Sequence, residues 1–101
     1  MLQQTVPPRL QSVLWSSNIY TINLKKDKTY IIHQILAYGD MEDIKWLFAT
    51  YPRTTIKNIF TTTPYKDYRR SRFYFIKDFV MDLAQKPFPE SSYVKNIPRA
   101  I

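Results

Sequence analysis

The segment Asp27–Leu47, DKTYIIHQILAYGDMEDIKWL, constrains the fold of this chain more than any other. It contains Gly39, the only glycine among 101 residues, at the point where one amphipathic pattern stops and another starts. Asp40 follows directly, and its side chain can cap a new helix together with Asp43 three residues later. Gly39, Asp40 and Asp43 therefore predict two helices joined by a tight turn, with Gly39 ending the first.

Apolar residues recur at helical spacing on both sides of this turn. We expect the first helix to begin within 25–28 and end at Tyr38, and the second to run from about Met41 to Tyr51. Pro52 ends the second helix because the residue before a proline disfavours the helical conformation. Trp46 lies off the apolar stripe of that helix. It either packs against a third element or anchors a partner protein, and we favour the first interpretation.

The rest of the chain predicts two further helices and two tails. A short helix over about 54–60 has Thr54 or Thr55 as its cap, and the pattern of 66–85 is that of the longest helix. Leu14 and Trp15 are expected to bury themselves against the first helix. The fold class is thus all-α, a small bundle of about four helices over residues 14–85.

Proline-containing segments without a helical period flank this single domain. Residues 1–13 are expected to form a flexible arm, and residues 86–101 an extended tail. The tail carries Phe88 and Tyr93, which is more apolar than a linker needs. These two side chains either pack back onto the helices or contact a partner.

Composition points away from several classes of protein. With no cysteine and with His33 as the single histidine, a zinc site would have only this histidine and carboxylates as ligands. A nucleophile–histidine pair would need a serine, and no serine lies in a nucleophile-elbow context. The acids Asp40, Glu42 and Asp43 fall at a helix start, where the helix dipole favours negative charge without a metal. We therefore expect no catalytic residue, no metal and no cofactor.

No apolar run is long enough to span a membrane, and the N-terminal sequence does not have the pattern of a signal peptide. We therefore expect a soluble cytoplasmic protein.

Positive charge is concentrated in one part of the chain. The formal net charge is +7, and the stretch from residue 53 to 77 has seven basic residues against one acid. These are Arg53, Lys57, Lys66, Arg69, Arg70, Arg72 and Lys77. Such a cluster attracts polyanions or acidic protein surfaces, so we take these residues as candidates for binding nucleic acid or an acidic partner.

The segment KDYRRSRFYF sharpens this expectation. Three arginines at the start of the last predicted helix oppose the helix dipole, and a bound phosphate or an acidic surface would offset that cost. Tyr68 and Tyr74 interleave with the arginines, which suits contacts to a partner or stacking on bases. Together with Trp46, Phe88 and Tyr93 they are our candidates for partner contacts.

The block YIIHQILAYGD followed by MEDIKWL resembles a family of small bacterial and archaeal helical domains of unknown function, whose pattern is FIIxRVLxYGDxEDxxWL. The resemblance covers about Leu14–Leu83 and departs from the pattern at His33 and Gln34, where the family tends to have charged residues, and at Ser16, where an Asp often follows the leading tryptophan. Members are often encoded beside nucleotidyltransferase-type toxins. The family has no established catalytic residues.

The resemblance therefore implies a bacterial, non-enzymatic, antitoxin-like or accessory partner of such a toxin. A basic transcriptional regulator that binds DNA or RNA is the alternative, and a homodimer remains open.

Overall fold

The computed structural model describes residues 6–83 and 88–94, and within them the fold is all-α, as predicted. Four α-helices follow one another: α1 (Lys28–Tyr38), α2 (Met41–Thr50), α3 (Arg53–Thr62) and α4 (Arg70–Phe75). Three shorter helical turns accompany them: the 3-10 turn η1 (Pro8–Ser12), the π-helical turn η2 (Ile76–Val80) and the 3-10 turn η3 (Glu90–Ser92). No described helix has both the length and the apolar character needed to cross a bilayer.

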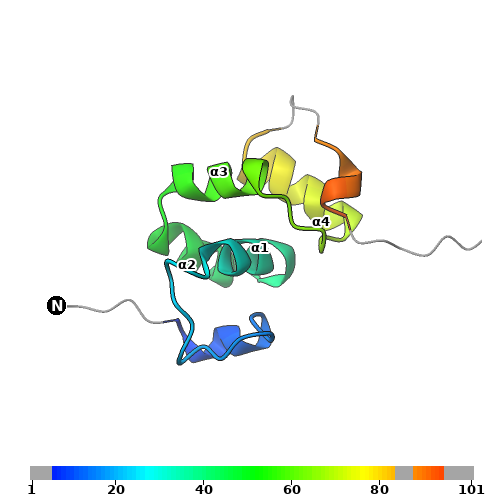
Figure 1. The fold of residues 1–101 in the computed structure, drawn as a ribbon. Coiled ribbons are helices and arrows are strands. Elements are labelled where there is room, and N and C mark those ends of the chain that lie inside the picture. The colour runs from blue at the N-terminus through cyan, green and yellow to red at the C-terminus, as the bar shows by residue number, and fades with distance from the viewer. Residues whose placement is uncertain (1–5, 84–87, 95–101) are drawn as a thin grey trace, which may run out of the picture.

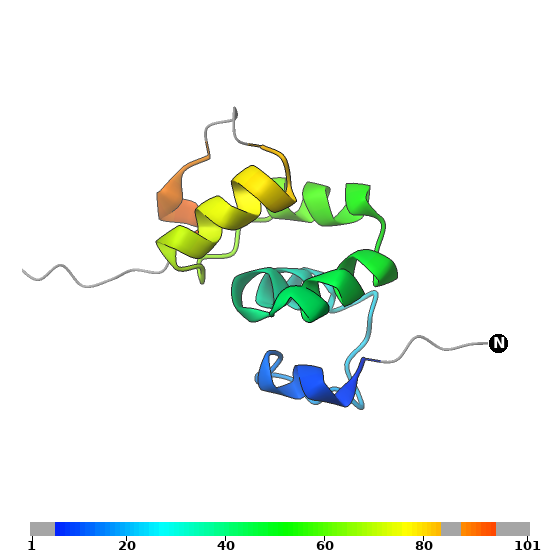
Figure 2. The ribbon, with the colours of Figure 1, turned by 180° about the vertical axis from the view of Figure 1, so that it is seen from behind.

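The helices are stacked in three tiers. Figures 1 and 2 show α1 and α2 in the middle tier, with η1 on one side and α3 and α4 on the other. The middle tier is therefore covered on both faces, which explains why every residue from Ile31 to Ala37 is buried. Polar side chains tie the tiers together, since Gln34 donates to the carbonyl of Val13 at 2.9 Å and accepts from Tyr65 at 3.3 Å.

The turn between α1 and α2 has the predicted capping box. The amide of Asp43 donates to Asp40 Oδ1 at 2.9 Å, and the amide of Asp40 donates to Asp43 Oδ2 at 3.0 Å. Gly39 ends α1 in an extended conformation with φ of −72°, so its role is spatial. A Cβ there would lie 2.7 Å from the carbonyl oxygen of Ile35, and only glycine leaves that gap.

The N-terminal segment differs from the prediction. Of residues 1–13, predicted to be a tail or a loosely docked arm, 1–5 lie outside the described residues. Residues 6–13 pack onto the bundle, where Val6 and Leu10 are buried. Proline pre-sets the backbone for the short helical turn η1, and Leu10 then inserts into the core. Leu14 is buried as expected, but Trp15 is 55% exposed and lies edge-on against Tyr38.

The region after α3 also differs. The predicted helix over 66–85 is replaced by α4 and η2, which together span only residues 70–80. Tyr68 is drawn into an isolated bridge with Val94, and its amide donates to the carbonyl of Tyr93 at 2.9 Å. Neither Thr54 nor Thr55 caps α3, because Pro52 occupies the cap position.

The described part of the tail, residues 88–94, packs back onto the helices. Tyr93 is 1% exposed and its hydroxyl donates to the carbonyl of Phe60 at 2.6 Å. The ring of Phe88 lies 6.3 Å from that of Phe60. Phe88 and Tyr93 therefore pack back onto the helices, which was the first of the two interpretations. The rest of the predicted tail, 95–101, lies outside the described residues, as do 84–87.

Candidate functional site

Two of the predicted phosphate-binding residues serve the fold. Arg72 reaches from α4 to the end of α1, where its Nε donates to the carbonyl of Leu36 at 2.7 Å and its Nη2 to that of Gly39. These carbonyls have no partner within the helix, so Arg72 takes the place of a C-terminal cap. Lys77 is 6% exposed, and its Nζ lies 2.7 Å from Asp78 Oδ1. The guanidinium of Arg72 and the ammonium of Lys77 are therefore both bonded to groups of the fold.

Two more basic residues are exposed but engaged. Arg53 donates to the carbonyl of Val80 at 2.8 Å and lies over the ring of Phe48, which ties the start of α3 to the end of η2. Arg70 pairs with Glu90 at 3.1 Å. The pKa of Glu90 is lowered by its hydrogen bond from Tyr74 and by Arg70. Because this pair is exposed, it contributes little to stability.

Lys66 and Arg69 are exposed, and Lys57 is half-buried on α3. Arg69 forms no ion pair with any carboxylate of the described residues. It lines a groove of about 440 Å³ between the end of α1 and the start of α4. The other lining residues are Ala37, Tyr38, Ser71, Arg72 and Phe75. Of the predicted basic cluster, Arg69 and Arg72 are the two members among these lining residues.

Two large aromatic side chains extend this groove along the helix. Phe75 lines the groove and is 37% exposed, and its ring centroid lies 6.1 Å from that of Phe79, which is 76% exposed. The groove residues with Phe79 are hereafter called the α4 face. It combines a free guanidinium with an apolar surface that the described part of the chain does not cover.

Most of the aromatic residues predicted to contact a partner are placed elsewhere. Tyr68 and Tyr93 are fully buried, while Trp46 and Phe88 are half-buried against the core. Tyr74 is partly exposed beside the α4 face and hydrogen-bonds to Glu90. The sequence-based candidates did not include Phe75 and Phe79. The signal in the sequence is the run of three aromatics at 73–75, because three consecutive residues cannot all lie on one side of a helix.

His33 has a structural position. It is fully buried, its Nε2 lies 2.7 Å from the carbonyl of Thr63, and its Nδ1 lies 2.8 Å from the hydroxyl of Tyr68. A carbonyl only accepts, so in the neutral ring Nε2 carries the proton and Tyr68 donates to Nδ1. Burial lowers the pKa of His33 to about 4, and it raises the pKa of Tyr68 well above its usual range.

The acids of the α1–α2 turn are also accounted for. Asp43 is buried and accepts from Arg9 Nε at 3.1 Å, in addition to its place in the capping box. The hydrogen bond from the amide of Asp43 lowers the pKa of Asp40. Among the described residues, no three histidines or carboxylates come together as a metal site.

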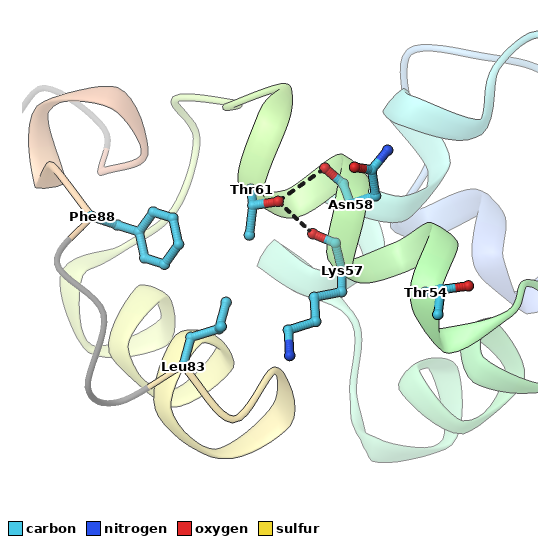
Figure 3. A pocket seen from close by; sticks show the side chains of 6 residues that line it. All are labelled: Thr54, Lys57, Asn58, Thr61, Leu83 and Phe88. Carbon is cyan, nitrogen blue, oxygen red and sulfur yellow. Dashed lines mark hydrogen bonds between the residues drawn. The ribbon is translucent and has the colours of Figure 1, made fainter.

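A second hollow of about 470 Å³ lies on the outer face of α3 (Figure 3). Its walls come from α3 and from the chain on either side of residues 84–87. The lining residues are Thr54, Lys57, Asn58, Thr61, Leu83 and Phe88. None of its described lining residues belongs to the α4 face, so the two are separate candidate sites.

Residues 10–60 match a family of unknown function, DUF6922. The match includes the YGD block and the helices α1 and α2 with most of α3, and it ends before α4. No curated protein and no solved structure matches the chain. The resemblance to a family of unknown function is therefore confirmed at that level: the chain belongs to this family, over about half of its length.

Proposed function

We propose that this chain is a non-enzymatic binding protein that contacts a partner protein through the α4 face. The observation that carries the proposal is the exposed pair Phe75 and Phe79 beside the unpaired guanidinium of Arg69. Aromatic residues and arginine are enriched in protein interfaces, and other charged residues are depleted at the centre of an interface. Single exposed apolar residues are common on soluble proteins, but a contiguous pair next to a groove is a stronger signal.

The backbone beneath these residues supports the same proposal. Phe79 belongs to the π-helical turn η2, in which the amide of Met81 donates to the carbonyl of Ile76 at 2.8 Å. Such turns are rare in proteins, and those that occur are often found at functional sites. The single histidine is engaged in the fold, since both ring nitrogens of His33 are hydrogen-bonded in a buried position.

The family resemblance gives the partner a more specific identity. We propose a nucleotidyltransferase-type toxin encoded beside this chain, with the chain as its antitoxin or accessory protein. The test is co-expression of the neighbouring gene with and without this chain, followed by co-purification. We expect the neighbour to be toxic alone and harmless with the intact chain. No rescue by the intact chain would overturn the toxin assignment.

Variants of the α4 face test the binding surface itself. Phe75→Ala/Phe79→Ala and Arg69→Glu should each abolish co-purification while leaving the melting temperature unchanged. Tyr20→Ala is the matched control, because Tyr20 is an aromatic residue 80% exposed outside the α4 face. Equal binding by all of these variants and the parent chain would show that the partner is bound elsewhere.

A nucleic-acid-binding regulator is the second candidate, favoured by the exposed Lys66, Arg69 and Arg70. If it is correct, binding in a mobility-shift assay should weaken steeply with salt, by about one ion per phosphate contact. Arg69→Ala/Arg70→Ala should abolish it, while Phe79→Ala should have a smaller effect. Salt-insensitive or absent binding would remove this candidate.

A further inference from the structure

The pocket on the outer face of α3 has two chemically different walls. Figure 3 shows Leu83 and the ring of Phe88 on one side, and Lys57 with Thr61 extending from α3 on the other. Leu83 is 6% exposed, so the apolar wall continues directly into the core. A volume of about 470 Å³ lies in the range of small-molecule sites.

Among the described residues, the polar wall carries one charge. Lys57 is half-buried, and none of the described residues that line the pocket is a carboxylate. Thr61 donates its hydroxyl hydrogen to the carbonyl of Lys57 or Asn58, at 3.0 and 3.2 Å, which holds this side chain in place at the rim. An ammonium beside an apolar wall favours a ligand that has both an anionic group and an apolar group. The anionic group can then pair with the ammonium while the apolar group packs against the apolar wall.

We propose that this pocket, the α3 pocket, binds a small organic monocarboxylate with an apolar body. The carboxylate pairs with the ammonium of Lys57, and the hydrocarbon packs against Leu83 and Phe88. One cation among the described lining residues fits a single negative charge, whereas a polyphosphate is recognised by several cations or a row of backbone amides. The α3 pocket is independent of the proposed partner contact, since it shares no residue with the α4 face.

Phenylacetate is a suitable probe, with the neutral phenylacetamide as its matched control. Titration of the intact chain followed by amide NMR should shift the resonances of Lys57, Asn58 and Phe88. Phenylacetamide should bind about tenfold more weakly, because one charge-assisted contact is worth about that factor. Equal binding of the two compounds, or shifts centred on Arg69 instead, would overturn the proposal.

Two substitutions separate a built site from general attraction to a basic protein. Lys57→Gln should weaken phenylacetate binding about tenfold and leave the melting temperature unchanged. Lys66→Gln removes the same charge from an exposed position outside the pocket and should have no effect. If both substitutions weaken binding equally, the attraction depends on net charge and no carboxylate site exists.

Discussion

The helices up to α3 and the segment from α4 onward use their side chains in different ways. In the first region several polar side chains stabilise the fold: Asp40 and Asp43 cap α2, Gln34 joins two tiers, and Arg9 pairs with Asp43. In the second region the helix is short and turns π-helical, and Phe75 and Phe79 are exposed.

The family match covers the first region and ends before α4. Under the proposed function, the first region is a scaffold and the second carries the surface that contacts the partner.

The largest expected effect comes from Phe60, which joins the two regions. It is fully buried, and its ring lies 5.0 Å from that of Tyr93 and 6.2 Å from that of Phe73. Phe60→Ala should lower the free energy of unfolding by about 3–5 kcal/mol through lost burial and a cavity. Chemical denaturation followed by circular dichroism measures this.

Phe79→Ala is the matched control for that substitution and should stay within about 0.5 kcal/mol, because its ring is exposed. Both variants should still unfold in one transition. A separate early transition in Phe60→Ala would show that the second region folds independently of the first, and the comparison would then describe two units.

The next effect concerns Arg72, which lies in the second region but stabilises the first. Arg72→Met keeps much of the aliphatic packing and removes the hydrogen bonds to the carbonyls of Leu36 and Gly39. We expect a loss of about 2–3 kcal/mol, because bonds from a charged donor to partly buried carbonyls are lost. Arg69→Met, three residues earlier on the same face, should change stability by less than about 0.5 kcal/mol.

The ranking of the two substitutions should reverse when binding is measured in place of stability. Arg69→Met should weaken co-purification of the partner, while Arg72→Met should act mainly through stability. If Arg69→Met is as destabilising as Arg72→Met, the division between a binding arginine and a capping arginine is wrong.

A pH effect of similar or smaller size comes from His33 in the first region. Its pKa is lowered from 6.5 to about 4 by burial, so between these values the unfolded chain binds a proton that the folded chain does not. This contribution to stability is therefore fully present above pH 6.5 and is lost as the pH decreases toward 4, by about 3 kcal/mol in total.

His33→Gln provides the control for this pH dependence. The variant should be less stable at pH 7 but should show a flatter dependence between pH 6.5 and 4. Asp40 and Glu90, whose pKa values are lowered, would keep part of the acid dependence in both proteins. An unchanged slope in His33→Gln would show that these or other groups control acid unfolding.

The sequence predicted the first region better than the second, for a physical reason. The signals for α1, α2 and α3 are local: an apolar stripe, a capping pair and a proline define each helix within a few residues of where it occurs. The capping box of Asp40 and Asp43 needs only a separation of three residues, and it is present as predicted.

The second region depends on contacts between distant parts of the chain. Tyr68 leaves the predicted helix because its amide donates to the carbonyl of Tyr93, 25 positions later, and the guanidinium of Arg72 is engaged by carbonyls more than 30 positions earlier. No local pattern encodes such pairs. The sequence shows that basic residues are concentrated between 53 and 77. Which of them form hydrogen bonds or ion pairs within the fold depends on residues that are distant in the sequence.

The smallest effect tests the backbone of the second region. Asp82 has a φ of +58°, and it follows the end of η2 where the amide of Leu83 donates to the carbonyl of Lys77 at 2.8 Å. Glycine adopts this conformation without steric cost, so Asp82→Gly should raise the free energy of unfolding by about 0.5 kcal/mol. Asp82→Ala should lower it by about the same amount, because alanine tolerates the left-handed region less well than aspartate.

Urea midpoints of the three proteins give the order Gly, Asp, Ala. The same variants sharpen the comparison of the two regions when binding is measured. If the backbone after Phe79 already has its partner-binding conformation in the free protein, Asp82→Gly should bind the partner no more tightly than the parent chain. The substitution then stabilises the folded state without changing the binding surface. A clear gain in binding that follows stability would mean that the second region is ordered by its partner, and that its irregular helix reflects weak folding and not a built surface.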